Sequence, residues 1–295
     1  MADCRRGGRE PGPREFLVGI GRGAAGALIF GLPMLMTMEL WQLGFYMERK
    51  RLLVLVLFNV PLLVMLARLV GFERTYSLTQ AVRDAMIAYG LGILISAIIL
   101  FLLGDLQEGI SWAAMIGKVA IQAVPASIGA LLGRSQLGHQ NGSNGAPQGS
   151  SPKADAEGVV QDKMSSSYAH ELFLMSVGAL FLNLNVAPTE EIILISYKMT
   201  PWHALATIVA SIAIMHAFVY TVAFKGTHQM PKAAPWWHVL VRFTLPGYIV
   251  AMVVSMYVLW LFGRLDGKAV NQILTSSIVL SFPGAIGAAA ARLIL

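Results

Sequence analysis

Residues 23–46 read GAAGALIFGLPMLMTMELWQLGFY, and residues 172–197 read LFLMSVGALFLNLNVAPTEEIILISY. Both stretches are mostly apolar over the length that an α-helix needs to cross a bilayer, about 20 residues. Each carries a glutamate near its end, Glu39 in the first and Glu191 in the second, at a spacing of 152 residues. Because a carboxylate within a hydrocarbon layer is costly, a matched pair of them indicates a function or a specific structural role.

The composition of the whole chain is that of a membrane protein. Of 295 residues, 56% are hydrophobic and 13% are charged, whereas a soluble domain carries about 25% charged residues. We therefore expect an all-α polytopic membrane protein whose main partner is the lipid bilayer. The apolar residues form eight runs that predict transmembrane helices, at 23–46, 52–71, 85–104, 112–133, 172–197, 204–224, 238–263 and 273–294.

A polar stretch separates the fourth and fifth runs. It is rich in Gly, Ser, Asn, Gln and Pro, a composition that cannot bury a core and predicts disorder. We therefore predict four parts in chain order. They are a cytoplasmic N-tail (1–22), a first four-helix membrane repeat (23–134), a disordered cytoplasmic linker (135–169) and a second four-helix membrane repeat (170–295).

The basic residues near the ends of the runs indicate the orientation of the chain. With eight spans, both termini and the linker lie on one side of the membrane, and this side carries most of the Lys and Arg residues. Basic residues gather on the cytoplasmic side, so we expect both termini in the cytoplasm. The cluster Arg49-Lys50-Arg51 argues against this orientation, because it would face outward.

The two halves share more than the glutamates. Spans 85–104 and 238–263, with the residues beside them, match at a spacing of 159 residues, at Arg83/Arg242, Tyr89/Tyr248, Ser96/Ser255, Gly104/Gly263 and Leu106/Leu265. Spans 112–133 and 273–294 match in the same way at a spacing of 158 residues, at Pro125/Pro283, Ile128/Ile286, Gly129/Gly287, Ala130/Ala288 and Arg134/Arg292. The order of these matches predicts duplication of a four-span unit.

Because four is an even number, both units would enter the membrane in the same direction. They would then be parallel repeats, related by a pseudo-twofold axis along the membrane normal. Glu39 lies about 16 residues into its span, or roughly 24 Å from the cytoplasmic end. We therefore expect Glu39 and Glu191 at the same depth in the outer third of the membrane, facing each other if spans one and five line the axis.

The eight spans, the repeat and the Pro188-Thr189-Glu190-Glu191 interruption resemble a family of bacterial integral membrane proteins of unknown function with two tandem four-helix repeats. The resemblance covers nearly the whole chain except the N-tail and the linker. It implies an architecture and a location in the bacterial inner membrane, and it implies no mechanism.

The residues around the two glutamates predict a site for a small cation or a proton. Carboxylate, hydroxyl and amide oxygens are the ligands that hard cations prefer. Pro188 would also break the fifth span and free backbone carbonyls there. The candidate ligands are Glu39, Glu191, Glu190, Thr37, Thr189, Asn183 and Asn185.

A structural role explains the same glutamates equally well. Pro188 suits the first turn of a new helix, where Glu190 and Glu191 would complement the positive end of the helix dipole. Glu39 could extend to the outer interface. The sequence leaves both explanations open for Glu39 and Glu191, and it favours the structural role for Glu190, whose counterpart in the first half is Met38.

Other intramembrane polar residues allow two interpretations each. Lys118, one helical turn from Gln122, could be a counter-ion to a glutamate, although a place near the interface is favoured. His216, one turn from Tyr220, could relay protons, although a hydrogen-bonded packing role is favoured. Asn59 is expected to pack between helices.

These features together predict a transporter or channel for a small cation or proton that uses the paired intramembrane glutamates. The alternative is a non-transporting membrane protein, a sensor or assembly factor that acts through its cytoplasmic linker. We expect neither an enzyme nor a cofactor, because His170-Glu171 is followed by Leu174 instead of the second histidine of a zinc motif and no phosphate-binding loop is present. We also expect no nucleic-acid partner, because no basic stripe is interleaved with aromatic residues.

Overall fold

The computed structural model describes residues 13–35, 37–70, 78–106, 109–139, 160–223 and 236–294, and within these ranges the chain forms helices and connecting turns. The first half contains α1 (Pro13–Leu35), α2 (Met38–Tyr46), α3 (Arg49–Val70), α4 (Leu78–Leu102) and α5 (Trp112–His139). The second half contains α6 (Val160–Val186), α7 (Glu191–Lys198), α8 (Pro201–Ala223), α9 (Trp236–Val239), a short π-helical stretch η1 (Leu240–Thr244), α10 (Leu245–Leu261) and α11 (Val270–Ile294).

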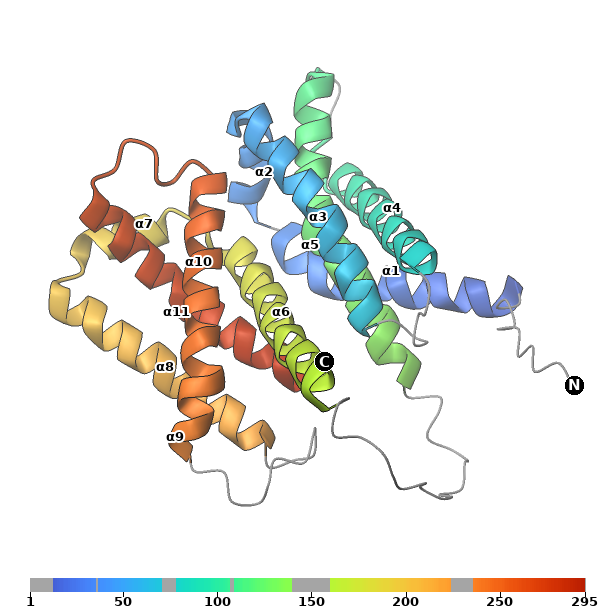
Figure 1. Cartoon of the computed structure of the whole chain (residues 1–295). Helices are drawn as coiled ribbons and strands as arrows, with labels where there is room; N and C mark the ends of the chain where they lie inside the picture. The colour runs from blue at the N-terminus through green and yellow to red at the C-terminus, as the bar shows by residue number, and fades with distance from the viewer. Residues whose placement is uncertain are drawn as a thin grey trace, which may run out of the picture.

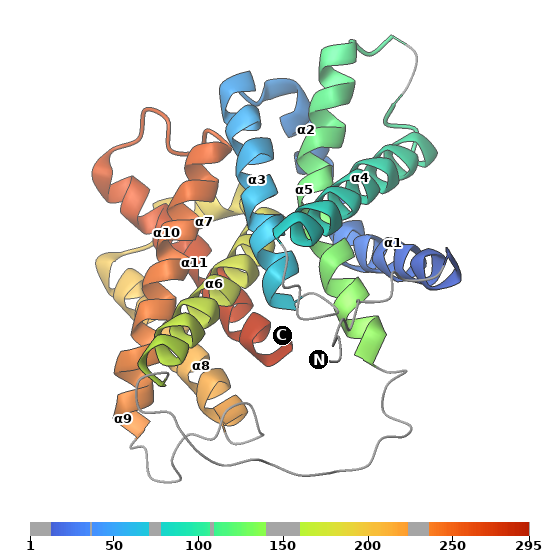
Figure 2. The same cartoon turned by 45° about the vertical axis from the view of Figure 1, so that its right-hand side comes forward.

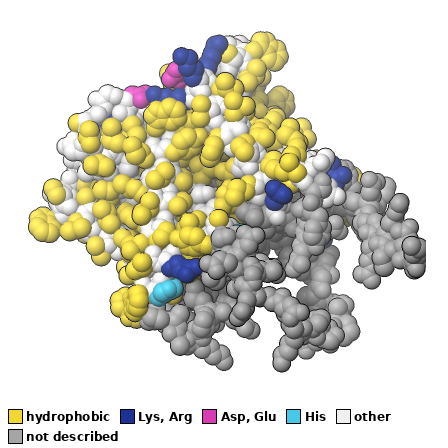
Figure 3. All heavy atoms as spheres, in the orientation of Figure 1, with side chains coloured by type: hydrophobic (Ala, Val, Ile, Leu, Met, Phe, Trp, Pro, Cys, Tyr) yellow, Lys and Arg dark blue, Asp and Glu magenta, His cyan; other side chains and the backbone are white. Residues whose placement is uncertain are grey.

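The structure confirms an all-α polytopic membrane protein. In the described part of the chain, eight helical stretches are long and apolar enough to span a bilayer. Apolar side chains cover most of the face drawn in Figure 3, and its few charged side chains lie in a cluster at the top and singly in the lower and right-hand parts. This distribution fits a hydrocarbon layer around the middle of the molecule and water at its two ends.

The first apolar run differs from the single span predicted at 23–46. It consists of α1 and a separate short helix, α2, with the interruption between Leu35 and Met38. The interruption predicted at Pro188 in the fifth run is confirmed, because α6 ends at Val186 and α7 begins at Glu191. Both halves therefore begin with a long helix followed by a short one.

Helices also extend into the segments predicted to be a tail and a linker. Helix α1 begins at Pro13, within the predicted N-tail 1–22. Helix α5 continues to His139 and α6 begins at Val160, so both ends of the predicted linker 135–169 are helical instead of disordered. Residues 140–159 lie outside the described residues, and their disorder stays a prediction.

Each half is packed around its last helix. Helix α5 contacts α1, α2, α3 and α4, and every residue from Ile121 to Gly133 is buried. Helix α11 has the same place in the second half, where it contacts α6, α7, α8 and α10. The two halves lie side by side in both Figure 1 and Figure 2.

Glycines allow the closest helix crossings. The backbone of Gly26 on α1 lies against Gly129 and Gly133 on α5, so closely that a Cβ at Gly26 would overlap with the Gly129 carbonyl oxygen. In the second half, Gly178 on α6 crosses Gly287 on α11 in the same way. Small residues at such crossings let helix backbones approach each other within a membrane.

The two halves meet through α1, α3 and α5 on one side and α6 and α10 on the other. Phe30 on α1 and Phe181 on α6 form an edge-to-face pair with ring centroids 5.6 Å apart. Spans one and five therefore contact each other, as an axis between them requires.

Candidate functional site

The first helix break lies between α1 and α2. The backbone N–H and the hydroxyl of Thr37 both donate to the carbonyl oxygen of Met34, at 3.1 and 2.8 Å. Helix α2 starts at the next residue, and Glu39 lies half-buried in its first turn. The hydroxyl thus stabilises the end of one helix immediately before the next begins.

The second break has the same geometry 152 residues later. Thr189 donates its N–H and its hydroxyl to the carbonyl oxygen of Val186, at 3.1 and 2.8 Å. Glu191 starts α7, and both Glu190 and Glu191 are exposed. Each threonine hydroxyl hydrogen is therefore already committed to the backbone, although each oxygen keeps lone pairs that can accept a further contact.

The two asparagines predicted as ligands have partners within the helix bundle. Asn183 is fully buried and its Nδ2 donates to Ser255 Oγ on α10 at 2.9 Å, while its side chain packs closely against Gly284 on α11. Asn185 donates from Nδ2 to the carbonyl oxygen of Phe181, at 3.2 Å. The structure therefore places Asn183 in the packing between α6, α10 and α11.

The three glutamates all lie at helix starts. A carboxylate in this position is stabilised by the unpaired N–H groups and dipole of the helix. The described residues contain no group of three or more His, Cys, Asp or Glu side chains that could hold a metal ion. Ligation of a cation by Glu39, Glu190 and Glu191 stays a prediction.

A basic side chain lies beside the second break, and another lies at the far end of α2. Arg264, in the turn after α10, donates from its guanidinium to the carbonyl oxygen of Pro188. In the first half, Lys118 packs against Gly44 of α2, and its Nζ lies 4.4 Å from the centroid of the Phe45 ring. Each short helix thus has a basic side chain beside it, Lys118 at the end of α2 and Arg264 before the start of α7.

Lys118 has an acidic partner, and this partner is neither Glu39 nor Glu191. Its Nζ lies 2.7 Å from Asp105 Oδ2, and the side chain of Lys118 is only 3% exposed. Asp105 follows Gly104, as Arg264 follows Gly263, so the two halves carry opposite charges at one matched position. Comparing the two halves for identical residues does not reveal the matched position of Asp105 and Arg264, because the two residues differ.

Comparison with protein families assigns the chain to a family. A family model described as "Putative integral membrane protein (DUF2391)" matches residues 19–295. The chain belongs to this family. The match covers both halves and supports the membrane location, and its description specifies no activity. Comparison with curated proteins gives no match, and comparison with solved structures gives none.

Further polar side chains of this family member are buried or half-buried between helices. Asn59 donates from Nδ2 to Ser127 Oγ at 3.0 Å, which confirms its expected packing role. His216 Nδ1 lies 3.0 Å from Thr244 Oγ1, in agreement with a hydrogen-bonded packing histidine. Gln122 is fully buried, and neither of its amide atoms has a hydrogen-bond partner among the described residues.

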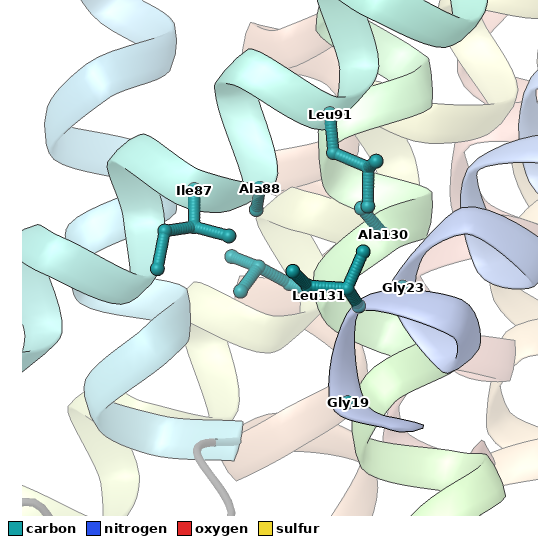
Figure 4. A pocket seen from close by; sticks show the side chains of 8 residues that line it. Gly19, Gly23, Ile87, Ala88, Leu91, Ala130 and Leu131 are labelled. Atoms are coloured by element: carbon teal, nitrogen blue, oxygen red, sulfur yellow. The ribbon is translucent and has the colours of Figure 1, made fainter. Parts of the chain in front are cut away.

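A small cavity between α1, α4 and α5 is not a candidate for a substrate site. Figure 4 shows its lining, which includes Gly19, Gly23, Ala88, Leu91 and Leu131. The cavity has a volume of about 20 Å³, room for about one water molecule. Because its lining carries no polar side chain, the cavity fits a packing gap between helices.

Proposed function

We propose that this protein is a transporter or channel for a small cation or proton, and that Glu39 and Glu191 are the groups that carry the ion. The observation behind this proposal is the pair of helix breaks, each followed within the next turn by a glutamate. Broken helices with ionisable residues at their ends are how many secondary transporters build ion sites within the membrane.

The surroundings of the breaks favour a proton or a monovalent cation over Ca²⁺ or Mg²⁺. Divalent sites need several oxygen ligands, usually including more than one carboxylate. The described residues offer no such acidic group, and Arg264 already places positive charge beside the second break.

We infer that the chain arose by duplication of a four-span unit. Beyond the residue matches, three local structures support this inference: the two threonine-capped breaks, the two glycine crossings and the two helix ends at Gly104 and Gly263. Both of these glycines have positive φ, 74° and 71°, and each is followed by the same pattern of backbone hydrogen bonds. Shared backbone geometry at matched positions is stronger support than shared residue types alone.

The proposal is tested by ion flux in proteoliposomes. We expect Glu39→Gln combined with Glu191→Gln to abolish flux of H⁺, Na⁺ or K⁺, because glutamine keeps the size of the side chain and removes its charge. Glu190→Gln tests the third glutamate separately. Because Glu190 lies at the same break and has no acidic counterpart in the first half, we assign it the structural role at the helix start and expect this variant to retain flux.

Two outcomes would contradict the proposal. If the double variant carried ions at the wild-type rate, neither Glu39 nor Glu191 would be part of the ion pathway. If the wild-type protein carried none of the tested ions, the result would favour the alternative of a sensor or assembly factor.

A further inference from the structure

A groove lies on the second half of the molecule, between α7, α8 and α11. Its volume is about 610 Å³, within the range of about 300–1,000 Å³ that is usual for sites of small molecules. Helix α8 contributes Ala206 and Ala210, one helical turn apart, and their short side chains leave the space open. Helix α11 contributes Val279 and Phe282 to the apolar wall.

The groove borders a helix that faces the lipid. Of the eight candidate spans, α8 is the least buried, at 17%. Leu205 and Val209, the neighbours of the two alanines, are 50% and 58% exposed. In a membrane-spanning helix this exposure means contact with acyl chains, so hydrocarbon can enter the groove from the side.

One end of the groove is basic. Lys198 is the last residue of α7 and His203 lies in the first turn of α8, and both are exposed and line the groove. His203 Nδ1 lies 2.7 Å from Thr200 Oγ1, a contact that holds the ring at this end. No Asp or Glu is among the described residues that line the groove.

The neighbourhood of this basic end resembles a membrane interface. Trp202, in the first turn of α8, is 79% exposed, as expected for an aromatic residue at the level of lipid headgroups. Glu191 lies on the same face of α7, two turns before Lys198 and about 10 Å from it along the helix axis. Lys198 therefore stands at the α7–α8 junction, and no carboxylate of the described residues lines the groove beside it.

We propose that this groove binds one acyl chain of an anionic glycerophospholipid, with the headgroup phosphate held by Lys198 and His203. The apolar part of the groove opens toward lipid and suits an acyl chain. Lys198 and His203 at its other end suit the headgroup phosphate. A Lys near a membrane surface, here Lys198, attracts anionic lipids by about 1 kcal/mol. This lipid site does not depend on the proposed ion transport by Glu39 and Glu191. Lipid affinity is measured without any ion flux, so either proposal can fail alone.

The full-length protein, purified in a nonionic detergent, allows a direct test. Native mass spectrometry would measure binding of phosphatidylglycerol, of phosphatidylcholine with the same acyl chains, and of inorganic phosphate. We expect phosphatidylglycerol to bind at least about fivefold more tightly than phosphatidylcholine, as one basic contact implies. We expect inorganic phosphate alone to show no binding in the same concentration range.

Two variants separate the headgroup contact from the acyl groove. Lys198→Gln with His203→Gln should reduce the affinity for phosphatidylglycerol to that for phosphatidylcholine, and Lys50→Gln, at an exposed basic residue of the first half, should not. Ala206→Leu should weaken binding of both lipids by filling the groove, and Ala113→Leu, at an exposed alanine of α5 in the first half, should not.

The proposal is overturned if the wild-type protein binds both lipids equally, or if inorganic phosphate competes as well as the lipid does. It is also overturned if the double variant at the basic end keeps the preference for phosphatidylglycerol. A loss that appears equally in Ala206→Leu and Ala113→Leu would show that the groove is not the site.

Discussion

Glu39 and Glu191 lie in the first turns of helices of nine and eight residues. The helix dipole favours a carboxylate there by about 0.3–1 kcal/mol, whether or not the carboxylate binds an ion. Thermal stability therefore cannot distinguish the structural role from the transport role, since both predict a small loss in the glutamine variants. Flux distinguishes them, because only an ion carrier loses it.

The buried pair between Lys118 and Asp105 provides a second prediction for single residues. We expect Lys118→Met to lower the free energy of unfolding by about 3 kcal/mol, because it leaves the partly buried Asp105 without its cation. Adding Asp105→Asn should restore much of the loss by removing the unpaired charge. Unfolding in detergent, followed by tryptophan fluorescence, measures both changes.

The double variant is the informative control in this cycle. If Lys118→Met with Asp105→Asn were as unstable as Lys118→Met alone, the loss would come from packing of the lysine stem against Gly44 and Phe45. A loss below about 0.5 kcal/mol in Lys118→Met would instead show a solvated pair of the surface type.

The sequence predicts the positions of these residues better than it predicts their hydrogen-bond partners. The matched spacing of Thr37 and Thr189 identified two equivalent positions, yet the structure shows hydroxyls that cap helix ends. A threonine oxygen is a suitable ion ligand and a suitable cap, and residue type alone cannot separate the two uses. The partner of Lys118 was not predictable, because Asp105 approaches it only once α4 and α5 have packed.

Prolines illustrate the same limit at the scale of helices. Pro33, Pro61, Pro125 and Pro283 all lie inside helices, whereas Pro188 lies at a break. Neighbouring helices in a membrane satisfy the backbone groups that a proline frees, so the residue does not by itself end a helix. The break after α1 has no proline at its centre, and for this reason it was missed.

The glycine crossings provide a prediction for helix packing. We expect Gly26→Ala to destabilise the protein by about 1–3 kcal/mol, because the new methyl group would overlap with the backbone of α5 at Gly129. Gly178→Ala should act in the same way at the crossing of α6 and α11. Thermal unfolding of the purified variants measures the loss.

Gly90→Ala is the matched control for these substitutions. Gly90 lies within helix α4, and a Cβ there would have no atom within 4 Å. Alanine has the higher helix propensity, so this variant should be at least as stable as the wild type. Equal losses at Gly26 and Gly90 would show that the effect is not caused by the close crossing.

At the scale of the molecule, Arg51 joins the two halves. This residue of α3 donates to the carbonyl oxygen of Trp260 and to Asp266 Oδ1, both at 2.8 Å, and its guanidinium lies 5.3 Å from the centroid of the Trp260 ring. Pairing along the sequence could not predict this contact, because its partners lie 209 and 215 residues away. The matched residues predict the order of helices within each half. Contacts such as that of Arg51 determine how the two halves pack against each other.

The orientation of the molecule is testable through its single cysteine. Cys4 lies in the segment predicted to be cytoplasmic, so a membrane-impermeant maleimide should label it only after the cells are permeabilised. Ala269→Cys in a Cys4→Ser background places the thiol in the exposed turn between α10 and α11, which should react in intact cells. Arg49, Lys50 and Arg51 would then face outward, against the usual charge bias, with Arg51 paired to Asp266 and Glu48. The reverse labelling pattern would show that this cluster, instead of the basic residues near the termini and linker, sets the orientation.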